Sequence, residues 1–262
     1  METLAETKET ATRYFDEVAS VYFDENYAET EEKYPILYLR QKYILDMIDG
    51  RGGKALDVGC GSGAMLVDLT KRGFEAFGVD ISANMLKSAR ELSSKLGLRE
   101  PPSLVADIEN LPFAKGSFDL IICAGVVEYL TRDDRALSEI SRVLRSDGTA
   151  FITVTNALTP YFFLETVAKI SSIWPKMISL ANGGVPFPRA RVHAPFSLVN
   201  MAAKTGLEEV DRAYFDFTPF PFPLGVNFPN LRKSLGLKME KLSKTRLGFI
   251  ARGCIIKFAK KN

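Results

Sequence analysis

Between Lys54 and Thr155 the sequence alternates between short apolar runs and segments whose apolar residues recur at helical spacing. Strands that alternate with helices form right-handed βαβ units, which build a mainly parallel sheet with helices on both faces. This alternation predicts an α/β fold. The expected strands are residues 55–58, 75–80, 103–107, 118–124 and 149–155, and the expected helices between them are residues 64–72, 83–96 and 133–144.

The flanking segments follow different patterns. Residues 14–27 and 36–49 are predicted to be N-terminal helices, since apolar residues in the second of them recur at helical spacing. After Thr155 the alternation stops, and an aromatic segment, a Gly/Pro/Arg-rich loop and a helix beginning near Phe196 follow. The last two strand-like runs, residues 207–217 and 248–259, are joined by a long Pro/Phe-rich connection. They predict an antiparallel hairpin at the edge of a seven-stranded, mostly parallel sheet.

Composition narrows the possible partners. The 34 Lys and Arg exceed the 32 Asp and Glu by only 2, so the basic stripe that nucleic-acid binding requires is not expected. The three cysteines are far apart in the sequence, which favours buried thiols in a reducing compartment over disulfides or a zinc site. A single histidine cannot build a metal cluster either. The polar, acidic N-terminus lacks the apolar core of a secretion signal, and no run is long enough to span a membrane. A cytoplasmic protein is the expectation.

Three glycines, Gly59, Gly61 and Gly63, follow the first expected strand in the segment KALDVGCGSGAML. Loops after parallel strands form ligand sites at the carboxyl edge of the sheet, and glycines let the backbone approach a ligand closely. The segment satisfies both a GxGxG and a GxGxx(G/A) pattern. The glycines therefore predict an adenosine-containing ligand without separating a dinucleotide from others.

Three acidic residues make that distinction. Asp57, just before the glycines, would gain nothing beside a pyrophosphate but would suit a ligand with an ammonium group. Asp80 ends the second strand, 21 residues after Gly59, where a carboxylate accepts hydrogen bonds from ribose hydroxyls. Asp107 follows the third strand, where it can accept from an adenine amino group. Alone, Asp80 could be a helix cap and Asp107 part of a turn.

The segments LDVGCGSGAML, FGVDISANML, ADIENLPFAKGSFDLIICAGVVEYL and ALSEISRVLRSDGTAFITVTN together resemble the successive motifs of class I S-adenosylmethionine-dependent methyltransferases. The similarity is greatest to the ubiquinone and menaquinone biosynthesis type. It runs from about residue 54 to residue 156, with a weaker echo in FDEVASVYFD. The resemblance implies a Rossmann-like fold, S-adenosyl-L-methionine as cofactor and methyl transfer to a small molecule.

The resemblance also implies roles for individual residues. Asp57, Gly59 and Gly61 would hold the methionine end, Asp80 the ribose, and Asp107 with the Ile108 backbone the adenine edge. Ile81 and Met85 would pack against the adenine, Ala124 and Gly125 would lie beside the sulfonium, and Tyr14 or Tyr22 would close over the cofactor.

A general base would help if the acceptor is a hydroxyl, an amine or an acidic carbon. The candidates are Glu128, Tyr129 and His193. Related enzymes often carry histidine near the Glu128 position, whereas this chain has VVEYL, which leaves the base unassigned. Glu128 could equally cap or pair with a neighbouring helix, and His193 could serve its loop.

The acceptor is expected to be apolar or amphiphilic, such as a lipid or a quinone. Aromatic residues are frequent in segment 161–180 and in the connection after residue 214, although they could also form a second small core. Arg189 and Arg191 could hold an acidic group of the acceptor. An alternative for segment 161–180 is contact with a membrane surface, with Lys169 and Lys176 beside Trp174.

One domain is expected over residues 1–262. Its parts are a helical cap (1–50), the cofactor-binding core (51–156), a lid and substrate insertion (157–205) and the C-terminal strands (206–262). Two alternatives remain open at this point. One is a nicotinamide-dependent oxidoreductase, favoured by Ala64 completing GxGxxA, and the other is a noncatalytic protein that binds the cofactor or a partner.

Overall fold

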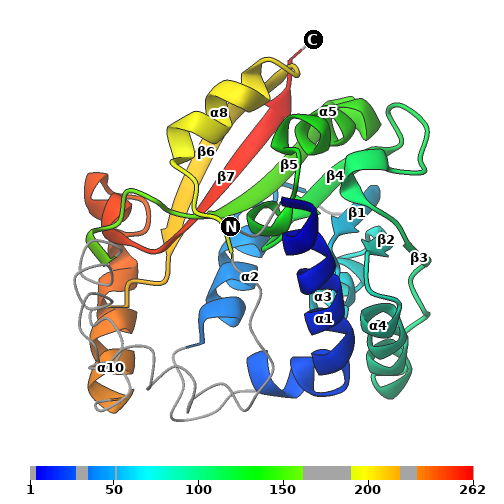
Figure 1. The fold of residues 1–262 in the computed structure, drawn as a ribbon, viewed down its shortest axis with the longest axis horizontal. Helices are drawn as coiled ribbons and strands as arrows, with labels where there is room; N and C mark the ends of the chain where they lie inside the picture. The colour runs from blue at the N-terminus through cyan, green and yellow to red at the C-terminus, as the bar shows by residue number, and fades with distance from the viewer. Residues whose placement is uncertain (1–3, 28–34, 51, 162–189, 219–228, 262) are drawn as a thin grey trace.

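The computed structural model describes residues 4–27, 35–50, 52–161, 190–218 and 229–261 (Figure 1). Its helices are α1 (Leu4–Asn26), α2 (Ile36–Met47), α3 (Ala64–Lys71), α4 (Ala83–Lys95), α5 (Asp133–Val143), α8 (Pro195–Ala203) and α10 (Pro229–Met239). Its strands are β1 (Lys54–Val58), β2 (Glu75–Asp80), β3 (Ser103–Val105), β4 (Phe118–Cys123), β5 (Leu144–Thr155), β6 (Leu207–Phe215) and β7 (Gly253–Lys260). No helix in these ranges is both long and apolar enough to cross a bilayer.

The strands form one seven-stranded sheet in the order β3-β2-β1-β4-β5-β7-β6. Neighbouring strands from β3 to β5 pair in parallel, whereas β7 is antiparallel to both β5 and β6. The predicted mostly parallel sheet with an antiparallel C-terminal hairpin is therefore confirmed. The strand order reverses between β1 and β4, which is where an open sheet of this kind binds ligands.

Alternating side chains of the central strands build a core on each face of the sheet. On one face Leu56, Ile121 and Ile152 pack with buried residues of α5 and α8. On the other face Ile122 and Phe151 pack with buried residues of α2, α3 and α4. Burial on both faces explains why these strands are almost continuously apolar in the sequence.

Helix α1 lies along α4 (Figure 1). The Asp16 carboxylate accepts a hydrogen bond from the Ser82 hydroxyl at the start of α4, and the Ser88 hydroxyl donates to the Ala19 carbonyl over 3.0 Å. These bonds, together with buried Ala11 and Ala19, fix α1 across the edge of the sheet where the parallel strands end.

Several elements differ from the sequence prediction. Helix α1 begins at Leu4 rather than at residue 14, and β5 begins at Leu144 rather than near Thr149. Helix α10 lies within the connection that was expected to be a loop, and Pro229 at its first position suits a helix start. Residues 246–250 form a short 3₁₀ helix, so β7 begins only at Gly253. Most of the aromatic segment 161–180 lies outside the described residues.

Candidate functional site

A cavity of about 1450 Å³ lies at the carboxyl edge of the parallel strands. Its walls come from the ends of β1, β2, β4 and β5, from α1 and α2, and from α10 and the residues where β6 ends and β7 begins. The predicted cofactor residues that line it are Tyr22, Gly59, Gly61, Asp80, Ile81, Met85, Asp107, Ile108 and Ala124. Topology thus brings together side chains that lie up to about 100 positions apart in the sequence.

The glycine loop after β1 needs its glycines for different reasons. Gly59 has a φ of +70°, and a Cβ there would collide with the Val126 side chain. Gly63 has a φ of +84°, and a Cβ there would lie 2.8 Å from that of Ala89 on α4. Around Gly61, with a φ of +51°, there is space toward Tyr22. The loop therefore packs closely at both ends and leaves open backbone at its centre.

Asp80 ties this loop to the end of β2. One carboxylate oxygen accepts from the Gly61 N–H over 2.8 Å, and the other accepts from the Ser82 N–H over 2.9 Å. The cap of α4 is the Ser82 hydroxyl, which accepts from the Met85 N–H, so Asp80 is not needed as a helix cap. Asp80 is 8% exposed and lines the cavity, as a ligand-binding carboxylate would.

Asp107 combines two roles. One carboxylate oxygen accepts from the Glu109 N–H over 3.0 Å and caps a short 3₁₀ helix, as the turn interpretation expects. The other oxygen pairs with the Lys8 ammonium of α1, and the side chain still lines the cavity. The neighbouring Ile108 side chain is buried. Lys8 is a residue that the sequence analysis did not single out.

Asp57 lies inside the end of β1, 3% exposed, and is not among the cavity-lining residues. Its carboxyl makes no hydrogen bond with any group that the structure describes. Burial, reinforced by the nearby Asp80 charge and opposed by Arg40, raises the pKa of Asp57 from 3.8 to about 7. A buried acid without a partner is costly, so this position favours a cationic ligand group nearby.

We expect Asp57 to make the free energy of unfolding fall as the pH rises from about 4 to about 7. The unfolded chain releases the Asp57 proton near pH 3.8, whereas the folded chain holds it to about pH 7. Unfolding therefore releases a proton in this window, and the loss reaches up to about 4 kcal/mol across it. Urea unfolding of the wild type and Asp57→Asn at several pH values measures the difference.

The Asp57→Asn variant should show a smaller pH slope and be the more stable protein at pH 8. Glu75→Gln, at the exposed start of β2, is the matched control and should keep the wild-type slope. Equal slopes in the wild type and Asp57→Asn would contradict the assignment.

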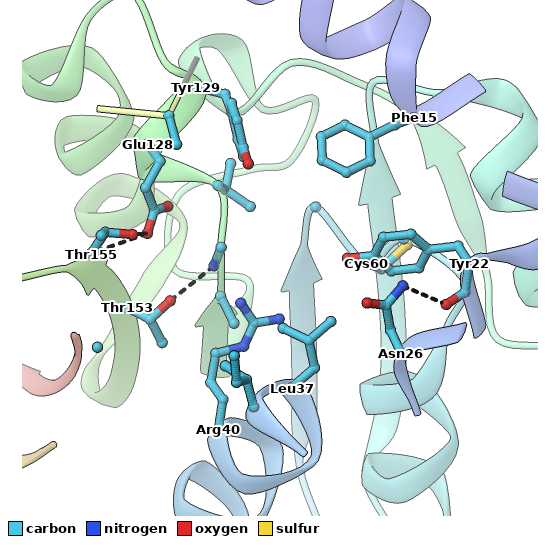
Figure 2. Close-up of a pocket in the computed structure, with 18 of the residues that line it drawn as sticks. Phe15, Tyr22, Asn26, Leu37, Arg40, Cys60, Glu128, Tyr129, Thr153 and Thr155 are labelled. Carbon is cyan, nitrogen blue, oxygen red and sulfur yellow. Dashed lines mark hydrogen bonds between the residues drawn. The ribbon is translucent and has the colours of Figure 1, made fainter. Parts of the chain in front are cut away.

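Arg40 of α2 points into the centre of the cavity, between Thr153 on one side and Tyr22 and Asn26 on the other (Figure 2). A Cβ on Gly125 would collide with its guanidinium, so the glycine after β4 leaves room for this charge. The Gly125 N–H donates to the Thr153 hydroxyl over 2.9 Å, which fixes the loop. Arg40 was missed in the sequence, where it looks like any charged residue of an amphipathic helix.

The Arg40 charge acts on the groups around it. Burial raises the pKa of Tyr22 and Tyr27, and Arg40 opposes both shifts. The Arg40 guanidinium interacts electrostatically with the buried Asp57 carboxyl, so one basic and one acidic group lie close together here. Such a pair complements a zwitterionic ligand group.

Glu128 lies in the short 3₁₀ helix after β4 and is 6% exposed. Its Oε1 accepts from the Thr155 N–H over 2.9 Å and from the Thr155 hydroxyl over 3.1 Å (Figure 2). Its Oε2 is buried without a hydrogen-bond partner. Burial raises the pKa of Glu128, with Arg40 and Thr155 acting against that shift. The side chain is thus anchored through one oxygen and keeps the other for a further partner.

His193 is not brought to the cavity wall. Its Nε2 lies 3.2 Å from Asp133 Oδ2, and its backbone N–H donates to the Thr155 carbonyl over 2.9 Å. Arg191 pairs with the same Asp133 and donates to the Val127 carbonyl over 2.9 Å. Both side chains hold the segment after residue 190 against the start of α5. Arg189 lies outside the described residues.

Comparison with known proteins shows what this chain is similar to. Residues 56–152 match a family described as methyltransferase domain. A biotin biosynthesis bifunctional protein of Cellvibrio japonicus is 27% identical over 188 residues, which are 70% of this chain and 35% of that protein. A ubiquinone biosynthesis O-methyltransferase of Methylococcus capsulatus is 28% identical over 129 residues, or 49% of this chain and 54% of that protein.

Among solved structures, magnesium protoporphyrin IX methyltransferase from Synechocystis PCC 6803 with bound SAH superposes with a TM-score of 0.64. It is 15% identical, and the match covers 97% of this chain and 100% of that one. The chain spans between about a third and about half of the length of the two curated relatives above. The solved structure therefore supports the fold over nearly the whole chain, and the sequence matches cover mainly its centre.

Proposed function

We propose that this chain is an S-adenosylmethionine-dependent methyltransferase that transfers a methyl group to a small apolar or amphiphilic molecule, which the match of residues 56–152 to a methyltransferase domain supports. The observation that carries the proposal is the shape of one cavity. Its first half joins the glycine loop, Asp80 and Asp107, and its second half continues between apolar side chains of α2 and α10. One space thus has room for a nucleoside ligand and for an acceptor beside it.

The residues present fit the cofactor S-adenosyl-L-methionine. Asp80 would accept from the ribose hydroxyls, Asp107 and the Ile108 backbone would bind the adenine edge, and Ile81 with Met85 would pack against the ring. Gly59 and Gly61 leave bare backbone at the methionine end. There Arg40 would pair with the carboxylate, and the buried Asp57 behind the cavity wall would favour the ammonium group through its charge. When bound, the cofactor supplies an electrophilic methyl group on a sulfonium.

The chain's own contribution to the transfer is alignment and exclusion of water. Phe15 and Tyr22 of α1 and Tyr129 after β4 cover the cavity, and the Phe15 ring stands edge-on to both tyrosine rings. Ala124 and Gly125 form the wall at the end of β4, between the cofactor half and Glu128. Glu128 Oε2 takes the acceptor's proton as general base. His193 is retained only as a weaker candidate, because it contacts Asp133 instead of the cavity.

The acceptor half favours an apolar molecule. Ile36, Leu37, Tyr38, Phe215 and Leu237 line it. The ubiquinone biosynthesis O-methyltransferase among the relatives supports a quinone-like or lipid-like acceptor, since it shares the core of the fold with this chain.

Two titrations test the cofactor, and a transfer assay tests the reaction. We expect S-adenosylhomocysteine to bind in calorimetry and NADH not to bind. Incubation with methyl-labelled S-adenosylmethionine and a panel of quinols, phenols and fatty acids should then label an organic-extractable product. Binding of NADH instead would favour an oxidoreductase, and binding of S-adenosylhomocysteine without transfer to any class of acceptor would favour a noncatalytic role.

A further inference from the structure

The acceptor half of the cavity ends at a group of cationic side chains. Arg232 and Lys233 from α10, and Arg252 just before β7, line this end, and we call them the cationic end of the cavity. One carboxylate, Asp216 just after β6, lines the same region. Asp216 pairs with Arg252, so Arg232 is the cation at this end whose partner has to be sought.

Arg252 is fixed in place by its neighbours. Its Nη1 lies 3.3 Å from Asp216 Oδ2, and its guanidinium stacks over the Tyr161 ring, 4.4 Å from the centroid. Its N–H also donates to the Asp216 carbonyl over 3.0 Å. Asp216 is thereby occupied, and its φ of 63° shows that the chain holds a strained turn to place it there. The Arg252 Nε is nevertheless buried without a hydrogen-bond partner.

Arg232 has a different environment. It forms no ion pair or hydrogen bond with the other residues that the structure describes, and its Nε is buried without a partner. It stands near the N-terminal end of α10, whose first turn contains no acidic residue. The helix dipole disfavours a cation there and favours an anion. Neither a contact with the described residues nor the helix itself explains why a positive charge faces the cavity at this point.

The sheet sets the distance from the cationic end to the site of transfer. Arg252 precedes β7, which is separated from β4 by β5 alone. Because adjacent strands lie about 4.8 Å apart, Arg252 is displaced sideways by about 10 Å from Ala124 and Gly125. It also lies beyond them along the strand direction, because the Asn156 N–H, just after β5, donates to the Arg252 carbonyl. The residues of β5 that line the cavity between these two points are Thr153, Val154 and Thr155.

We infer that the acceptor is an amphiphile with an anionic group, a carboxylate or a phosphate, held at the cationic end of the cavity, more than about 10 Å from Ala124 and Gly125. This inference rests on the proposed function. Arg232 is the specificity-determining residue, since its charge has no other partner among the described residues. Arg252 is a second contact whose orientation Asp216 and Tyr161 maintain.

The test measures binding of three probes to protein saturated with S-adenosylhomocysteine, which fills the cofactor half. The probes are monomeric decanoate, decyl phosphate and the neutral decanol, compared by calorimetry on the wild type, Arg232→Gln and Lys238→Gln. Lys238 is an exposed lysine of the same helix that does not line the cavity. Binding of S-adenosylhomocysteine to each variant reports whether the cofactor half is intact.

We expect at least one anionic probe to bind about tenfold more tightly than decanol to the wild type and Lys238→Gln, and this preference to disappear in Arg232→Gln. The anion that binds more tightly identifies a carboxylate or a phosphate. Equal binding of all three probes, no binding of any, or a preference that survives in Arg232→Gln would overturn the inference and leave the proposed function in place. Failure of the wild type to bind S-adenosylhomocysteine would overturn both.

Discussion

Replacement of Asp80 by asparagine is expected to weaken binding of S-adenosylhomocysteine by at least about 100-fold. A carboxylate that accepts from two ribose hydroxyls contributes about 1.5–3 kcal/mol per hydrogen bond, and an amide can accept only through its oxygen. The change also places an NH₂ group opposite the Gly61 or Ser82 N–H, each of which now donates to Asp80. Calorimetric titration of the purified variant measures the loss.

Two controls separate binding from folding. Glu75→Gln removes a carboxylate from the exposed first residue of the same strand and should bind like the wild type. Thermal unfolding of Asp80→Asn shows how far the loop after β1 is destabilised without ligand. A folded Asp80→Asn protein that binds within about threefold of wild type would remove Asp80 from the cofactor site.

The core of the fold and the cofactor half of the site were predictable because both follow from local patterns. Continuous apolar strands identify a sheet buried on both faces, and the carboxyl ends of parallel strands lie at one edge. Gly59, Asp80 and Asp107 each follow a strand, so their convergence in one cavity needs no knowledge of side-chain packing. The antiparallel hairpin was predictable for a similar reason, from two late strands after a long insertion.

The side chains that helices distant in the sequence bring to either half of the cavity depend on packing and were not predictable. Lys8 and Arg40 lie on helices whose patterns show which face is apolar but not what that face covers. Arg232 belongs to a helix that begins at the end of the Pro/Phe-rich segment 218–229, within the connection between the last two expected strands, where no helix was predicted. For His193 the sequence left a catalytic role and a loop role open, and the structure places its imidazole beside Asp133.

The sequence allowed either a catalytic or a structural role for Glu128, and the contacts of its carboxyl group are compatible with both. One oxygen serves the fold by accepting from Thr155, and the other remains buried and without a partner. The fold thus restricts the rotation of the carboxyl group and leaves Oε2 as the oxygen that could act as a base.

Replacement of Glu128 by glutamine is therefore expected to lower kcat by about 100-fold or more, with binding of S-adenosylhomocysteine unchanged. The glutamine oxygen can still accept from Thr155, so the anchor is kept while the basic oxygen is lost. Transfer of labelled methyl to the acceptor identified in the screen measures kcat. Thr155→Val, which removes only one hydrogen bond to the anchored oxygen, should reduce kcat far less.

The pH profile distinguishes a base from a structural acid. Burial raises the pKa of Glu128, so the base is lost by protonation at a higher pH than for an exposed glutamate. Wild-type kcat should therefore rise with pH as the Glu128 carboxyl loses its proton. The glutamine variant should lack this rise in its pH profile. A variant with the same limb and a kcat within about threefold of wild type would assign Glu128 to the fold alone, and transfer would then proceed by alignment of donor and acceptor without a base from this position.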